Sequence, residues 1–155
     1  MNYFISYEYR EAILDELMQH FFGGDKELFD AFYVSKNEIR EMHNAGMVIG
    51  SHTKTHPVLS KLSYEEQHDE ICGSYKQLED ICPSLSYKTF CYPYGGFHSF
   101  TNETENILNN CGCLFSFNVE YRDISDEDLK CAPQVLPRYD CNCFPHGKAW
   151  ESNII

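Results

Sequence analysis

Residues 41–63 read EMHNAGMVIGSHTKTHPVLSKLS, and this segment is the most informative one about the fold class. Within it, the apolar run 47–50 predicts a short buried strand. Ser51 and His52 follow that run directly. Polar residues in this position are typical of sites in α/β proteins, because ligands bind at the carboxyl ends of parallel strands. The stretch therefore predicts an α/β fold with a functional site where this strand ends.

The rest of the chain alternates between helical and strand-like patterns. Apolar spacing and capping residues predict helices at 7–22, 25–32, 36–45, 63–83 and 101–112. Short apolar runs predict further strands at 88–94, 113–119 and 134–136. A charged loop is expected before the last strand, and an irregular tail after Asp140. This alternation implies right-handed crossovers and a mostly parallel sheet.

Length and charge narrow the functional classes. The 155 residues predict one domain, with 1–34 as a helical N-terminal extension and 35–145 as the core that carries the motifs. Twelve basic and 24 acidic residues give a formal net charge of −12. This charge argues against nucleic acid and anionic lipid as partners, because both are bound through basic surfaces. A neutral or cationic small substrate fits the charge.

Targeting signals and cysteines bear on the compartment. The chain contains no run of about 20 apolar residues, so no membrane segment is predicted. Its first residues lack the apolar stretch of a secretory signal, so we expect a cytoplasmic location and reduced thiols for the eight cysteines. The C-x-C pairs Cys111/Cys113 and Cys141/Cys143 fit either small buried apolar residues or a soft-metal site.

The first candidate site is the pair His52 and His56. Two imidazoles four residues apart can share one metal ion. Pro57 disfavours the helical region for His56, so the pair is expected on a loop after the strand rather than within a helix. The alternative interpretation is that these are two unrelated loop histidines.

The second candidate site is the loop after the next strand, in the stretch KTFCYPYGG at 88–96. Its glycines allow the backbone to approach a ligand closely, and its backbone N–H groups are suited to stabilising an oxyanion. Its aromatic side chains are suited to stacking on a sugar ring. The alternative interpretation is an ordinary turn rich in aromatic residues.

Together the two stretches resemble the polysaccharide deacetylases of the NodB-like group. In that family a strand leads into H-[ST]-x-x-H, which the segment around His52 and His56 matches. A later block with the loose form R-x-x-[FY]-P-[YF]-G resembles KTFCYPYGG, after one intervening helix. The resemblance extends over roughly 36 to 145 and implies an incomplete or distorted (β/α) barrel.

The resemblance also implies a reaction and roles for residues. The reaction is hydrolysis of an N-acetyl or O-acetyl group on a carbohydrate, with a divalent metal, usually zinc, as cofactor. His52 and His56 match the metal ligands, and the backbone N–H of Tyr94 matches the oxyanion donor. The remaining loop residues that match substrate-binding positions are Tyr92, Pro93 and Gly95.

Several family positions differ here. The family's Asp-Asp-Gly, which supplies the metal-binding aspartate and the base, has no counterpart, and Asp25 lacks a preceding strand. Cys91 stands where many relatives carry arginine. The corner of the family's late histidine is assigned to Arg138 and Asp140, as catalytic residues or as a buried ion pair. His146 lies six residues beyond Asp140.

Three functional hypotheses follow. The first is a metal-dependent carbohydrate deacetylase whose site lacks its carboxylates, completed from this chain or by a partner chain, for instance in a homodimer. The second is a catalytically impaired relative that binds a glycan or a partner without turnover. The third is a thiol-based metal or redox protein that uses the C-x-C pairs.

Overall fold

The computed structural model describes residues 5–23 and 32–144. They group into two compact units. The first unit draws on residues 1–49 and 75–86, and the second on residues 50–74 and on those from 87 onward. The predicted single domain, with its extension over 1–34, stays a prediction.

The first unit is helical. Its helices are α1 (Tyr7–Phe22), α3 (Lys36–Asn44) and the C-terminal part of α4 (Tyr64–Ile81). α1 ends at Gly23, whose φ of 67° is the left-handed conformation that glycine adopts without strain. α1 and α3 confirm two of the predicted helices. The helix predicted over 25–32 falls almost wholly outside the described residues.

Capping pairs fix where the helices begin. The Ser35 backbone N–H donates to Glu38 at 2.7 Å, and the Glu38 N–H donates to the Ser35 hydroxyl at 3.2 Å. Ser63 and Glu66 make the same reciprocal bonds before α4, at 2.8 and 3.3 Å. Each box satisfies two N–H groups that a helix start leaves without a partner.

The strand predicted at 47–50 is wrong. These residues form no strand, and Met47 and Val48 are 57% and 71% exposed. Only Ser51 joins the sheet, through an isolated parallel bridge to Phe90. Four apolar residues in a row indicate a buried strand only when a neighbouring strand pairs with them.

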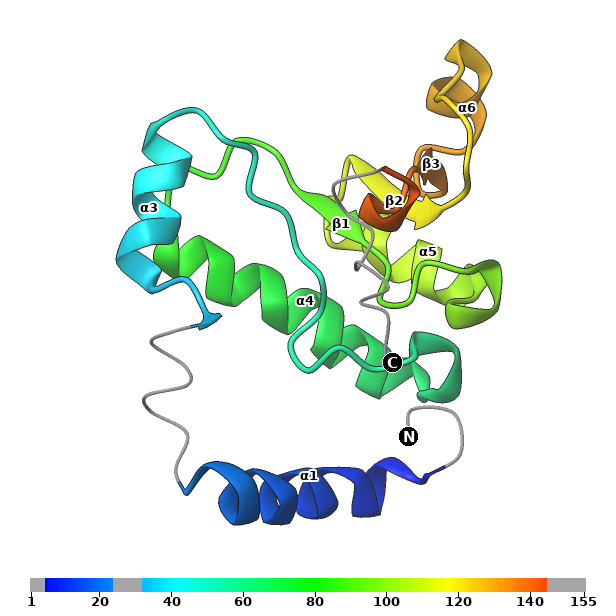
Figure 1. Ribbon diagram of the computed structural model, residues 1–155. Coiled ribbons are helices and arrows are strands. Elements are labelled where there is room, and N and C mark those ends of the chain that lie inside the picture. The colour runs from blue at the N-terminus through cyan, green and yellow to red at the C-terminus, as the bar shows by residue number, and fades with distance from the viewer. Residues whose placement is uncertain (1–4, 24–31, 145–155) are drawn as a thin grey trace, which may run out of the picture. The chain divides into compact units, whose positions relative to one another are not determined.

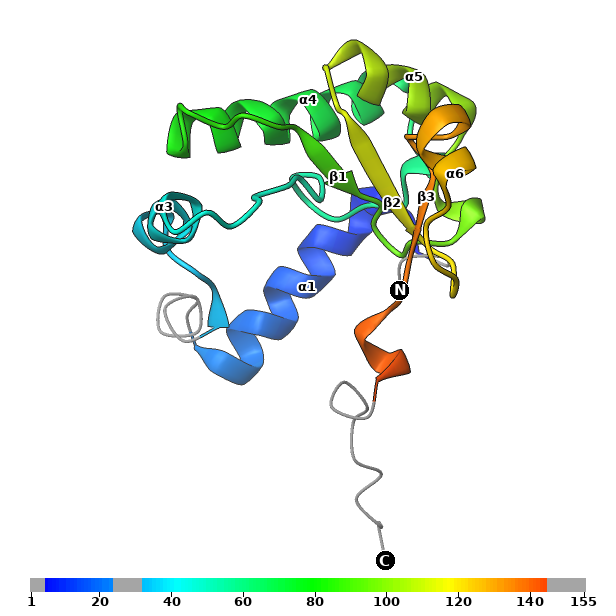
Figure 2. The same cartoon turned by 90° about the horizontal axis from the view of Figure 1, so that it is seen from above.

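The second unit contains a three-stranded parallel sheet. Its strands β1 (Thr89–Cys91), β2 (Phe115–Val119) and β3 (Leu136–Arg138) lie in the order β1-β2-β3. Figures 1 and 2 show the three strands side by side. The α/β class with parallel strands is thus confirmed. The described residues form an open sheet, and the barrel is not confirmed.

One face of this sheet is covered and the other is partly open. Along β2, Ser116 and Asn118 are fully buried, while the alternate residues on the other face are partly exposed. α5 (Asn102–Asn110) buries Ile107 and Leu108 completely. The core thus fills the covered face, as alternation along a strand requires.

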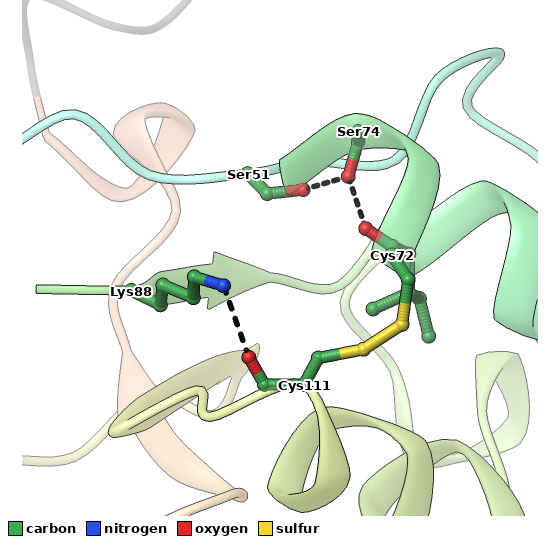
Figure 3. Close-up of a disulfide and its surroundings, with 6 residues drawn as sticks. Ser51, Cys72, Ser74, Lys88 and Cys111 are labelled. Atoms are coloured by element: carbon green, nitrogen blue, oxygen red, sulfur yellow. Dashed lines mark hydrogen bonds between the residues drawn. A yellow bond between two sulfur atoms is a disulfide. The ribbon is translucent and has the colours of Figure 1, made fainter. Parts of the chain in front are cut away.

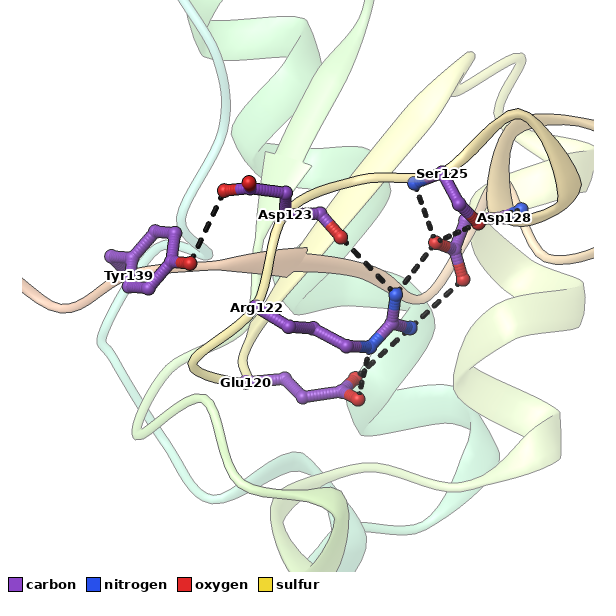
Figure 4. A network of polar contacts seen from close by, with 6 residues as sticks. All are labelled: Glu120, Arg122, Asp123, Ser125, Asp128 and Tyr139. Atoms are coloured by element: carbon purple, nitrogen blue, oxygen red, sulfur yellow. Dashed lines mark hydrogen bonds and ion pairs between the residues drawn. The ribbon is translucent and has the colours of Figure 1, made fainter.

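A helix replaces the charged loop that the sequence predicts before the last strand. α6 (Asp126–Cys131) begins after Ser125, whose hydroxyl accepts from the Asp128 N–H at 3.2 Å. Arg122 binds the Asp128 carboxylate with both terminal nitrogens, at 2.7 and 2.8 Å (Figure 4). The predicted irregular tail begins instead with a short 3₁₀ helix, Cys141–Cys143.

The expectation of reduced thiols is wrong for one pair. Cys72 of α4 and Cys111, which follows α5, form a disulfide (Figure 3). Their Cα atoms lie 6.1 Å apart, within the range that a disulfide can join. The two residues are 39 apart in sequence, so only the packing of α4 beside α5 brings them together.

Close to the disulfide, α4 also contacts Ser51, the residue that bridges to β1. The Ser51 and Ser74 hydroxyls are 2.5 Å apart, and the Lys88 ammonium donates to the Cys111 carbonyl at 3.2 Å (Figure 3).

Among the described residues, no helix has the length and apolar character needed to cross a membrane.

Candidate metal and carbohydrate site

The two predicted histidines lie together on the loop that follows Ser51. The ring centroids of His52 and His56 are 4.7 Å apart, and both side chains are exposed. The ring of Tyr94 lies 4.7 Å from that of His56, and its hydroxyl donates to the His56 carbonyl at 3.3 Å. The loop after β1 therefore lies beside the histidine loop.

A backbone contact sets the orientation of His52. Its Nδ1 lies 2.6 Å from the carbonyl oxygen of Cys91. A carbonyl oxygen only accepts, so Nδ1 must carry the hydrogen in this bond. In the neutral ring, the lone pair is then on Nε2, which is the arrangement typical of metal-binding histidines.

The left-handed backbone conformations cluster in these two loops. Among the described residues, the non-glycine residues with positive φ are Thr53, His56 and Tyr94, at 68°, 58° and 65°. Such residues are strained, and strain of this kind concentrates at functional sites. His56 is also outside the right-handed helical region, which the proline after it disfavours.

The histidine loop is held by Glu70 of α4. One carboxylate oxygen accepts from the Lys54 and Thr55 backbone N–H groups, at 2.8 and 3.0 Å. The other oxygen accepts from the Thr55 hydroxyl at 2.8 Å. No motif in the sequence points to Glu70, because it lies 14 residues beyond His56 in an ordinary helical pattern and only the fold brings it to the loop.

The predicted substrate-binding residues differ in their surroundings. Tyr92 is a core residue: it is 0% exposed, its ring stacks on Phe100, and its hydroxyl donates to the Gln134 carbonyl at 2.8 Å. Burial raises the pKa of Tyr92 far above its usual value. The Tyr92 side chain thus packs in the core, and its predicted substrate-binding role stays a prediction. Pro93 is buried as well.

Gly95 is required by the turn. Its φ is 66°, and a Cβ atom there would collide with the Val119 side chain. Its carbonyl accepts from the Val119 N–H at 2.6 Å, which ties the loop after β1 to the end of β2. Gly95 therefore sets the path of the backbone at Tyr94.

Arg138 and Asp140 lie at the same end of the sheet, beside Cys91. Burial raises the pKa of the Cys91 thiol, the Arg138 guanidinium opposes that rise, and the Asp140 carboxylate adds to it. The Nε of Arg138 is buried and has no hydrogen-bond partner within the part of the chain that the structure describes. Because the Cys91 carbonyl accepts from His52, this corner adjoins the histidine site.

The donor set matches a metal site in part. Two imidazoles suit a borderline ion such as zinc, whereas catalytic zinc usually has three protein ligands. Within residues 5–23 and 32–144, no group of three or more His, Cys, Asp and Glu side chains is placed to hold a metal ion. Asp25 and His146 lie outside the described residues.

Comparisons with known proteins agree on one family. The family model for polysaccharide deacetylase matches residues 13–115, which include both histidines and Tyr94 but neither Arg138 nor Asp140. A chitooligosaccharide deacetylase from Bradyrhizobium sp. (strain ANU 289) is 31% identical over 84 residues, which are 54% of this chain and 38% of that protein.

A solved structure agrees in fold. The Streptococcus pyogenes deacetylase PplD, in complex with acetate, superposes with a TM-score of 0.63 at 22% identity, over 75% of this chain and 48% of that one. The chain thus spans less than half the length of both relatives. Since the family model covers well over half of its residues, the chain belongs to the polysaccharide deacetylase family.

Proposed function

We propose that the chain acts in metal-dependent hydrolysis of N-acetyl groups on a carbohydrate, with zinc as the metal. The observation that carries the proposal is the orientation of His52 by the Cys91 carbonyl, next to the ring of His56. This orientation leaves Nε2 of His52 for a metal. Family membership supports the reaction class.

The proposal gives roles to the metal-binding and catalytic residues. His52 and His56 hold the metal, which when bound supplies a Lewis acid that polarises the acetyl carbonyl and makes water a better nucleophile. The Tyr94 backbone N–H stabilises negative charge on the acetyl oxygen. Arg138 and Asp140, beside Cys91, act as catalytic residues at the corner where the family has its late histidine.

The remaining parts of the assembly are also proposals. The three strands form part of an incomplete barrel, and a carboxylate from another segment or from a second copy of the chain completes the metal site. If a second copy supplies the carboxylate, light scattering should show a homodimer that binds one zinc per chain. A monomer that binds one zinc as tightly as a dimer does would contradict this source.

The test is zinc binding followed by acetate release. Calorimetric titration of the wild-type protein should give one zinc per chain, and the His52→Ala/His56→Ala double variant should lose at least about 100-fold in affinity. His68→Ala is the matched control, because His68 is an exposed histidine of α4 whose ring lies beside Tyr64.

The second arm measures acetate release from N-acetylglucosamine oligomers. We expect release by the wild-type and His68→Ala proteins and none by the double variant. Equal zinc affinity in all three proteins would contradict the assignment of the histidines. Tight zinc binding without acetate release would instead indicate a relative that binds a glycan without turnover.

The cytoplasmic location stays a prediction. Disulfides persist mainly in oxidising compartments, so the Cys72–Cys111 pair supplies a direct check. Trapping free thiols during cell lysis would show the pair reduced in a cytoplasmic protein and oxidised in an exported one.

A further inference from the structure

We infer that Glu70 is a positioning residue that sets the geometry of the loop between His52 and His56. For its effect on metal binding, this inference rests on the proposed function. For its effect on the loop itself, it rests on the hydrogen bonds alone.

The Glu70 carboxylate binds the middle of the loop at three points. Both loop N–H groups, of Lys54 and Thr55, point at one oxygen, and the Thr55 hydroxyl donates to the other. Hydrogen bonds to an ionised acceptor are stronger than neutral ones. Three of them on one side chain define the position of the two residues that separate Thr53 from His56.

The loop needs such support because its backbone is strained. Thr53 and His56 are both in the left-handed region. Internal bonds give partial support: the Thr53 N–H lies 3.4 Å from the Ser51 hydroxyl, and the His56 N–H donates to Thr53 Oγ1 at 3.0 Å. Strained conformations persist only where their surroundings over-determine them, and Glu70 adds the contacts from outside the loop.

Glu70 is itself firmly placed. The next residue along α4, Ile71, is 0% exposed, and the following one, Cys72, carries the disulfide to Cys111. Sites held by a helix that is fixed in this way are more precise than sites on loops alone. Through its hydrogen bonds, Glu70 therefore fixes the loop between the two histidines relative to α4.

The neighbouring Asp69 provides the matched control. Its carboxylate binds the Lys54 ammonium at 2.7 Å and is 72% exposed. It thus touches the same loop residue as Glu70, but through the side chain instead of the backbone. A salt bridge this exposed contributes little to fixing a loop.

The experiment compares Glu70→Ala, Glu70→Gln and Asp69→Ala with the wild-type protein. The first readout is hydrogen exchange of the Lys54 and Thr55 amides, measured by NMR without metal. We expect at least about tenfold faster exchange in Glu70→Ala, because both amides lose their acceptor. Asp69→Ala should match the wild type.

The second readout is zinc affinity by calorimetric titration. We expect Glu70→Ala to lose about 10–100-fold, as is usual when a residue that orients metal ligands is removed. Glu70→Gln should recover most of the affinity, because its amide oxygen can still accept from both backbone N–H groups. A general loss of structure would not be rescued in this way.

The outcomes separate the two proposals. Unchanged amide exchange in Glu70→Ala, or equal effects of Glu70→Ala and Asp69→Ala, would overturn the inference. If the wild-type protein binds no zinc while Glu70→Ala still frees the two amides, the proposed function fails and the positioning role stands. Should Glu70→Ala fail to fold, Glu70→Asp replaces it in both readouts, because a side chain one methylene shorter draws the carboxylate away from the Lys54 and Thr55 N–H groups.

Discussion

At the scale of single residues, two glycines with the same backbone conformation differ in the space around them. Gly95 and Gly112 both adopt left-handed backbone, with φ of 66° and 76°. Counting only the described residues, a Cβ atom at Gly112 would meet nothing within 4 Å, whereas at Gly95 it would meet Val119. The two glycines look alike in the sequence, and only the fold separates them.

This difference predicts unequal effects of alanine. Gly112→Ala should destabilise by about 1 kcal/mol from backbone strain alone. Gly95→Ala should cost about 1–3 kcal/mol more, because the added methyl group overpacks against Val119. Urea unfolding of both variants measures the difference. Equal losses would show that the Val119 contact yields without cost.

At the scale of elements, local capping signals explain most of the helices. The pairs Ser35/Glu38 and Ser63/Glu66 mark the starts of α3 and α4 in the sequence and in the structure. The same type of signal, Ser125 with Asp128, marks α6. The sequence prediction of a charged loop missed α6, because Asp128 lies among other acidic residues and does not stand out as a capping residue.

The α6 capping pair predicts a pH dependence. Arg122 and the Ser125 bonds hold the pKa of Asp128 well below its usual range. The carboxylate therefore stabilises the fold above about pH 4, and this contribution is lost as the pH falls through the folded-state pKa. Asp128→Asn should lower the melting temperature at pH 7, and the difference should shrink in acid.

Asp126→Asn is the control for this experiment, because Asp126 lies in the same first turn of α6. Its melting temperature should follow the wild-type curve with pH. A difference between Asp128→Asn and wild type that grows as the pH falls would contradict the assignment of the effect to this carboxylate.

At the scale of the whole molecule, the second unit combines a small sheet with a covalent link between helices. The disulfide closes a sequence separation of 39 residues between α4 and α5. By loop entropy, a link of this length contributes about 4 kcal/mol. For a chain of this size, we expect the disulfide to raise the melting temperature by about 8–16 °C.

The test compares Cys72→Ser with wild type, each with and without reductant. Without reductant the variant should melt at the lower temperature, and with reductant the two should converge. Cys131→Ser, which alters an exposed free cysteine, should match wild type in both conditions. A Cys72→Ser protein as stable as the oxidised wild type would exclude a stabilising link.

Features that depend on neighbours along the chain could be predicted from the sequence. These are the capped helices, the alternation that gives a parallel α/β sheet, and the two motifs that led to the family. Each rests on spacing within one turn, one strand or one loop, so the residues involved are near each other in any fold that contains the element.

Features that need a partner far away in sequence could be seen only in the folded molecule. The fold left 47–50 unpaired, joined Cys72 to Cys111, buried Tyr92 in the core and brought Glu70 to the histidine loop. Pairing, burial and cross-linking depend on which segments pack together. That packing follows from the sum of many weak contacts over the whole chain rather than from any short stretch of it.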